Sequence, residues 1–157
     1  MKIKQQNINK SLLILLSLSF FVRAVLAMII EFGNDEVYYW TYAMYPDWSH
    51  FDHPPMVGWL IQLFSCNLLF DSEFFLRLSS VIFMTINTYL VFLIGKQVKN
   101  EQTGFYAALL YTASIYAFVI TGIFILPDTP LSIFTLLAVL QFVKYFQYEK
   151  NKHLLLA

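Results

Sequence analysis

Four long apolar segments divide the chain into alternating apolar and polar stretches. A helix needs roughly 20 mostly apolar residues to cross about 30 Å of hydrocarbon, and each segment is near that length. The fourth is the weakest, because its apolar core is short and ends in Gln141, Lys144 and Gln147. The pattern predicts membrane-spanning helices over residues 12–30, 74–94, 105–126 and 129–148.

A fifth apolar stretch, residues 55–70, is shorter and begins with two prolines. Gly58, Gln62 and Ser65 recur in it at helical spacing, which gives an apolar helix one polar stripe. That pattern is typical of a helix that lies in the membrane interface. Nearer the first span, Asn34 is expected to cap a short aromatic helix. The loop over residues 31–72 is therefore predicted to hold two interfacial helices.

The composition excludes a soluble domain. The chain is 59% hydrophobic and 13% charged, whereas soluble domains have roughly 45–50% apolar and about 25% charged residues. The net charge is zero and no basic patch lies outside the membrane flanks, so no nucleic-acid partner is expected. The single cysteine, Cys66, is expected to be a small apolar filler. We therefore expect an all-α integral membrane protein that forms one module over residues 1–157.

Lysines and carboxylates separate across the predicted spans, and the lysines set the orientation. With four spans and a cytoplasmic N-terminus, every lysine faces the cytoplasm, and only Glu101 and Glu149 among the acids remain inside. A further crossing at residues 55–70 would place both later lysine clusters outside. The sequence thus predicts a multi-pass protein of the inner (plasma) membrane with an extracytoplasmic, periplasmic loop.

The first apolar segment has a second interpretation, as a cleaved signal peptide over residues 1–27. Lysines precede the apolar run, and Val25-Leu26-Ala27 is an acceptable cleavage site. Arg23 interrupts the run late, however, and the apolar stretch continues to Ile30. These flanks favour an uncleaved first span.

Acidic residues at three distant places in the chain fall on the predicted outer side: Asp35 with Glu36, Asp52, and Asp128. Each has an ordinary structural explanation, because acids favour helix N-termini and cap helices. The functional alternative is that they converge on one site, since acids at a membrane boundary are functional hypotheses by default. Desolvation beside the membrane would also make such a carboxylate more basic. The residues alone leave both interpretations open.

Cationic groups on the outer side are few. His50, Asp52 and His53 are weak candidates for a divalent metal site, because no thiol or further histidine supports them. Arg77 either pairs with a carboxylate four residues earlier or receives a lipid phosphate, which a guanidinium binds through two parallel hydrogen bonds. Arg23 lies about 10 Å of helix rise below the outer boundary, so it must snorkel or pair with a carboxylate.

Four short motifs occur in order on the predicted outer side. They are Asp35-Glu36-Val37-Tyr38-Tyr39-Trp40, Phe51-Asp52-His53-Pro54-Pro55, Phe75-Leu76-Arg77-Leu78-Ser79-Ser80 and Leu126-Pro127-Asp128-Thr129-Pro130-Leu131. Together they resemble the N-terminal part of bacterial GT-C glycosyltransferases of the protein O-mannosyltransferase and aminoarabinose-transferase-like group (glycosyltransferase family 39 and relatives). The resemblance extends from about Glu31 to Ala157.

The resemblance implies an inverting transferase that moves a hexosyl or pentosyl sugar from a polyprenyl-phosphate carrier to a hydroxyl of a lipid, glycan or protein. It implies Asp35 as the catalytic base and Asp128 as a second active-site carboxylate. Substrate contacts are expected from Glu36, Tyr39, Asp52, His53 and Arg77. No cofactor is required, because a phosphate leaving group needs no general acid. Arg77 or a divalent metal could stabilise the developing charge.

Members of that group carry many more spans than this chain, in which Leu154-Leu155-Leu156-Ala157 resembles the opening of a fifth. We therefore expect an apparently truncated N-terminal module of a glycosyltransferase, with an inactive fragment of such an enzyme as an alternative. Two other classes stay open, a non-catalytic scaffold subunit and a piece of a transporter. A transporter places its polar residues near the midplane at broken helices, and a scaffold would tolerate Asp35→Asn.

Overall fold

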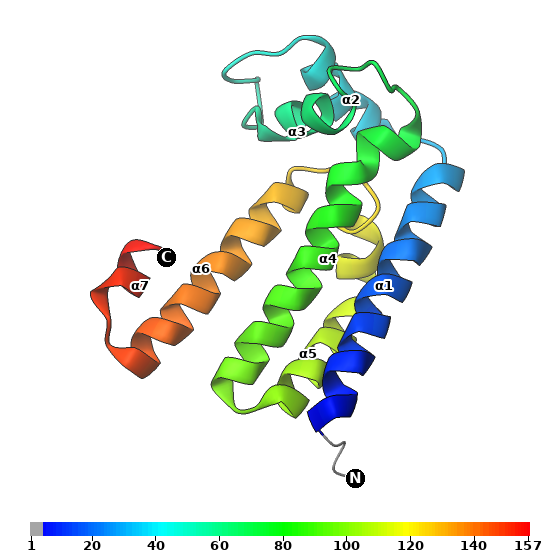
Figure 1. Ribbon diagram of the computed structural model, residues 1–157. Helices are drawn as coiled ribbons and strands as arrows, with labels where there is room; N and C mark the ends of the chain where they lie inside the picture. The colour runs from blue at the N-terminus through cyan, green and yellow to red at the C-terminus, as the bar shows by residue number, and fades with distance from the viewer. Residues whose placement is uncertain (1–4) are drawn as a thin grey trace.

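The computed structural model describes residues 5–157, with side chains from residue 7 onward, and that range is helical with no strand. Three helices are long and apolar enough to cross a membrane, with mean hydropathies of 2.5, 1.8 and 1.4 in chain order. They run side by side in Figure 1. They are α1 (Gln5–Ile29), α4 (Glu73–Val98) and α6 (Asp128–Tyr148).

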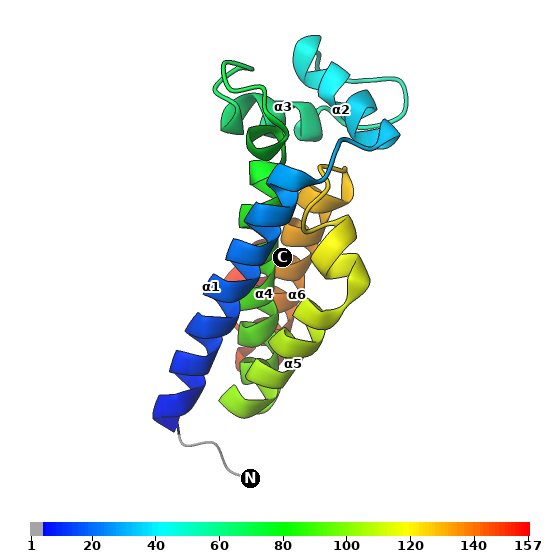
Figure 2. The ribbon, with the colours of Figure 1, turned by 90° about the vertical axis from the view of Figure 1, so that its right-hand side faces the viewer.

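Helix α4 is the centre of the bundle, because α1, α6 and the shorter α5 (Glu101–Ala113) all pack against it. Helices α2 (Asn34–Met44) and α3 (Met56–Phe64) pack on each other across one end of the bundle, as Figures 1 and 2 show. This end, which also holds the junction before α6, is called the loop end below. At the opposite end, α7 (Asn151–Leu155) packs back on α6.

The predicted third span, residues 105–126, is not one continuous helix. Helix α5 stops at Ala113 because Ser114 adopts an extended conformation, with φ −70° and ψ 129°. A single π-helical stretch, η1 (Tyr116–Ile120), follows, and then turns that lead into α6. The structure therefore has three long helices where the apolar pattern predicts four spans, and the third is a short helix joined to a broken segment.

The hairpin between α4 and α5 depends on two facing glycines. A Cβ on Gly95 would lie 2.8 Å from the Cα of Gly104, and a Cβ on Gly104 would lie 2.4 Å from the carbonyl oxygen of Phe92. No side chain fits there, so the backbones meet directly, as small residues allow in membrane helix pairs. Asn100 completes the turn, because its Oδ1 accepts from the Thr103 amide at 2.9 Å.

Both helices predicted within residues 31–72 are present, but the second ends early. Helix α3 stops at Phe64, and three consecutive residues, Cys66, Asn67 and Leu68, then take positive φ angles between 52° and 63°. Left-handed residues of this kind cannot continue a right-handed helix. Cys66 is exposed in this turn. The expectation that it fills an apolar gap is therefore wrong.

Candidate active site

The N-terminus of α2 presents Asp35 to solvent and turns Glu36 inward. The capping residue is Gly33 rather than the predicted Asn34, and the Gly33 amide donates to Oε2 of Glu36 at 3.1 Å. Asn34 is instead the first residue of the helix, because the side chain that bonds back to the Gly33 amide is the carboxylate of Glu36, three residues after the cap. Adjacent acids thus have opposite environments, with Asp35 exposed and Glu36 only 2% exposed.

Glu36 forms a buried ion pair with Arg77 of α4. The guanidinium donates from Nε to Oε1 at 2.8 Å and from Nη2 to Oε2 at 2.5 Å. The amide of Ile125 also donates to Oε1, at 3.1 Å. The remaining donors of Arg77 bind carbonyl oxygens at the C-terminal end of α1 and just beyond it, in Ala27, Ile30 and Glu31. One ion pair therefore joins α1, α2, α4 and the segment that leads into α6.

This arrangement differs from both expectations for Arg77. The guanidinium pairs with Glu36, 41 residues away in sequence, and not with Glu73 on its own helix. It is also completely buried, between the rings of Phe32 and Phe124, so no side is open to a lipid phosphate. The carboxylate and the carbonyls offset the cost of desolvating this guanidinium, and only the folded chain supplies them together.

Asp52 is the acceptor for two phenols of α2. Its Oδ1 receives the hydroxyls of Tyr38 at 2.8 Å and Tyr42 at 2.5 Å. Hydrogen bonds from Tyr42 and then Tyr38 hold the pKa of Asp52 below its usual value, because they favour the ionised form. Burial, followed by the bond to Asp52, raises the pKa of Tyr42. His50 stacks on the Tyr42 ring with centroids 3.6 Å apart.

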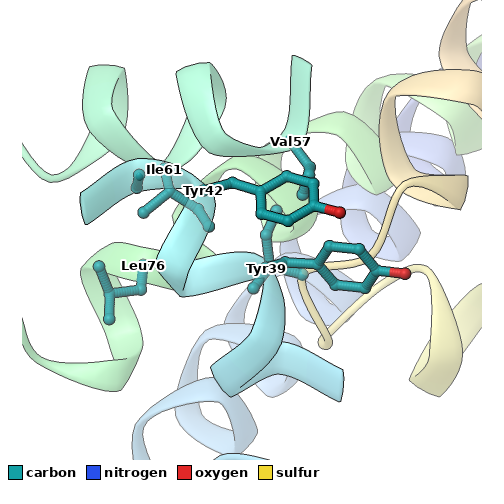
Figure 3. Close-up of a cluster of buried hydrophobic side chains, with 7 residues drawn as sticks. Tyr39, Tyr42, Val57, Ile61 and Leu76 are labelled. Atoms are coloured by element: carbon teal, nitrogen blue, oxygen red, sulfur yellow. The ribbon is translucent and has the colours of Figure 1, made fainter. Parts of the chain in front are cut away.

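Tyr39 is a buried phenol whose pKa responds to several nearby acids. Burial raises its pKa most, and the charges of Asp52, Asp35 and Asp128 each raise it further. The three carboxylates come from separate parts of the chain, and each is near enough for its charge to affect this phenol. Figure 3 shows the rings of Tyr39 and Tyr42 side by side in the apolar cluster of α2 and α3, with both hydroxyls pointing the same way, away from Leu76.

Asp128 opens helix α6, where its partner is a second tyrosine. The Tyr116 hydroxyl donates to Oδ1 of Asp128 at 3.0 Å. The N-cap is Pro127, so Asp128 does not cap the helix but is its first residue. Thr129 is fully buried, and its hydroxyl lies 3.3 Å from that of Ser80 on α4. Asp128 is thus fixed at the loop end, the same end as Asp35 and Asp52.

Two hollows adjoin these residues. One of about 310 Å³ is lined by Asp35 and Glu36 together with Phe124 and Leu126. The other, about 200 Å³, is apolar and lies between Pro54, before α3, and the prolines on either side of Asp128, with Val57 and Phe134 in its wall. The first hollow has carboxylates in its wall and the second is apolar, a pairing that suits a ligand with a polar head and an apolar tail.

The structure brings together part of the predicted site and separates the rest. The charges of Asp35, Asp52 and Asp128 all raise the pKa of Tyr39. The ring centroids of Tyr39 and His53 lie 5.5 Å apart. Glu36 and Arg77 are buried against each other. Across residues 7–157, no three acidic, histidine or cysteine side chains are close enough to hold a metal ion.

Sequence reasoning missed three phenols that hold the acids in place. Tyr38 and Tyr42 are four residues apart, so one helix face carries both, and that spacing could have paired them. Tyr116 offers no such signal, because it reaches Asp128 only through the break after α5.

These observations define a class: a helical protein with three helices able to cross a membrane and a group of acids and tyrosines at one end of its bundle. Comparison with family models then gives one match, over residues 52–157, to dolichyl-phosphate-mannose-protein mannosyltransferase. The match covers more than half of the chain, so the chain belongs to this family of GT-C-type glycosyltransferases. Neither the curated proteins nor the solved structures give a match. The matched residues include Asp52, Arg77 and Asp128 but begin after Asp35.

Proposed function

We propose that the loop end catalyses transfer of a sugar from a polyprenyl-phosphate carrier to a hydroxyl-bearing acceptor. The family membership supports glycosyl transfer in general. The observation that carries the finer proposal is the position of Asp35, Asp52 and Asp128 at one end of the bundle, with the exposed Asp35 in the wall of the 310 Å³ hollow. A lipid-linked sugar has the matching shape, with a polar sugar phosphate joined to an apolar chain.

In the proposed reaction, Asp35 is the base. It is exposed at the rim of the 310 Å³ hollow, where an acceptor hydroxyl can reach it. The acceptor oxygen attacks the anomeric carbon as the bond from that carbon to the phosphate oxygen breaks. Polyprenyl phosphate leaves with the electron pair, and the acceptor proton passes to Asp35. Attack opposite the leaving group inverts the anomeric centre, as in other direct displacements.

The remaining residues have supporting roles in this proposal. Asp128 and Tyr39 bind sugar hydroxyls, and Asp52 with His53 closes the polar side of the site. The first isoprene units lie in the apolar hollow beside Val57. Glu36 and Arg77 contribute to substrate binding indirectly, because their ion pair fixes the start of α2 and the segment before α6.

The reaction as proposed needs no resident cofactor. The phosphate leaving group departs without a proton, so one base is sufficient. A divalent metal would stabilise charge on that phosphate. Transfer that persists in excess EDTA supports the metal-free reaction, and complete loss that magnesium or manganese reverses would overturn it.

The proposed topology keeps four crossings, with α5 and η1 together forming the third. The N-terminus is then cytoplasmic and the loop end extracytoplasmic, because the lysines among the described residues lie at the opposite end from all the acids except Glu101 and Glu149. Membrane-facing aromatic side chains of α2 and α3 would lie at headgroup level.

The deciding experiment is Asp35→Asn in the full reading frame that contains this sequence. Washed membranes from cells lacking the gene supply the natural acceptor, and purified variant is added with tritiated polyprenyl-phosphate mannose, glucose or aminoarabinose. We expect at least one donor to be used by the unaltered protein and none by the variant. Asp71→Asn, another exposed carboxylate of the same loop, is the matched control and should retain transfer. Equal activity of both variants would remove Asp35 as the base and would favour a non-catalytic scaffold.

A further inference from the structure

Arg23 of α1 is a buried cation that is not part of the candidate site described above. Its side chain is completely buried, about six residues before the end of α1, or roughly 9 Å of helix rise. None of its three guanidinium nitrogens has a hydrogen-bond partner among the side chains and backbone that the structure describes. It neither snorkels to the boundary nor pairs with a carboxylate, so both expectations for it are wrong. A charge held this way inside a membrane bundle calls for a specific explanation.

The contacts of Arg23 all point to the broken segment between α5 and α6. Its guanidinium carbon lies 4.7 Å from the ring centroid of Phe118, in η1. A Cβ on Gly122 would lie 3.0 Å from its Nε, so the side chain touches the backbone there. The guanidinium therefore lies against the π-helical stretch and the turn after it, near the C-terminal end of η1.

A cation is favourable at this place for two reasons. The C-terminal end of a helix carries partial negative charge on its unpaired carbonyls, which attracts a guanidinium. The face of Phe118 adds a cation–π interaction, which becomes stronger when water is excluded. Irregular backbone at membrane depth is tolerated only where protein surrounds it, and Arg23 is part of the protein that lies against this segment.

The same broken segment fixes Asp128. Tyr116 is the first residue of η1, and its hydroxyl is the hydrogen-bond donor to Asp128 at 3.0 Å. Two residues later, Phe118 lies under the guanidinium. A continuous helix would rotate Tyr116 relative to the start of α6. We propose that Arg23 is a positioning residue, which holds residues 114–127 in their broken form and thereby keeps the Tyr116 hydroxyl on Asp128. The catalytic part of this inference rests on the role proposed for Asp128.

The test compares Arg23→Met with Tyr116→Phe and with the double variant, in the full reading frame. Methionine preserves the long stem and removes the charge, which lowers the cost of membrane insertion, so expression is not expected to fall. Each single variant should lower kcat/KM about tenfold or more, the scale of a lost hydrogen bond to a charged group. The double variant should be no slower than the slower single one, because both remove the same contact. Arg23→Lys should restore part of the rate.

Amide hydrogen exchange gives a readout that does not depend on activity. Arg23→Met should speed exchange in residues 114–127 and leave α6 unchanged, whereas Ser19→Ala, one turn earlier on α1, should change neither. Unaltered exchange in residues 114–127, or rate losses that multiply in the double variant, would overturn the inference. Asp128→Asn with full transfer would instead defeat the proposed role of Asp128, while the exchange result still decides whether Arg23 holds the segment.

Discussion

The strongest stability prediction concerns Glu36→Gln, which removes one charge from the buried ion pair without changing the shape of the side chain. The carboxylate accepts two hydrogen bonds from Arg77, one from the Ile125 amide and one from the Gly33 amide. A carboxamide has only one acceptor oxygen, so its NH₂ group must face a donor on one side. The guanidinium, which is completely buried, then loses its counter-charge.

The expected cost follows from that loss. Removing one partner of a buried ion pair destabilises a protein by about 3–5 kcal/mol, because the other charge stays buried and uncompensated. For a chain of this size, about 1 kcal/mol corresponds to a fall of roughly 2–4 °C in melting temperature, so we expect a fall of roughly 6 to 20 °C. Replacing both partners, as Glu36→Gln with Arg77→Met, should cost less than the sum of the single changes.

The assay is thermal unfolding in detergent micelles, followed by circular dichroism. Glu73→Gln is the matched control, because Glu73 is an exposed carboxylate on α4, one turn before Arg77. An exposed substitution of this kind should change stability by no more than about 0.5 kcal/mol. If Glu36→Gln and Glu73→Gln have the same melting temperature, the ion pair does not hold the loop end to the bundle, and the reasoning is refuted.

Three further predictions follow from local contacts. Gly104→Ala should lower the melting temperature, since its Cβ would lie 2.4 Å from a carbonyl oxygen of α4; an unchanged circular-dichroism melt would contradict that contact. Tyr42→Phe removes the largest cause of the lowered pKa of Asp52, so in a carbon-13 NMR titration with falling pH the carboxylate should protonate at a higher pH than in the unaltered protein; coincident titration curves would contradict this. In a Cys66→Ser background, Ser49→Cys should react with an impermeant thiol reagent added to intact cells, and labelling only after lysis would reverse the proposed orientation.

The path of the chain was largely predictable from sequence, because the bilayer imposes a simple length requirement. Three of the four predicted spans are long helices, with ends within several residues of those expected. The exception is residues 105–126, which are apolar enough to read as one helix. Hydropathy gives no sign of the break after Ala113, because residues 105–126 are apolar on both sides of it. The buried cation that lies against the broken segment, Arg23, comes from another helix.

The candidate site was predictable in outline but not in its contacts. The shared side of Asp35, Asp52 and Asp128 follows from counting spans, and the structure has all three at the loop end. Their partners do not follow from the same count. Tyr116 reaches Asp128 only because the segment before α6 is broken, and a pattern of apolar residues carries no information on such a turn.

Sequence by itself determined the membrane environment, the helical class and the end of the bundle where the acids gather, since these depend on composition and on spacing along the chain. Only the tertiary structure decided which charges neutralise one another. Glu36 and Arg77 are separated by 41 residues yet share two hydrogen bonds, whereas Asp35 beside Glu36 stays exposed. The physical reason is desolvation: a buried charge needs partners at short distance, and distances between remote residues exist only after the helices have packed.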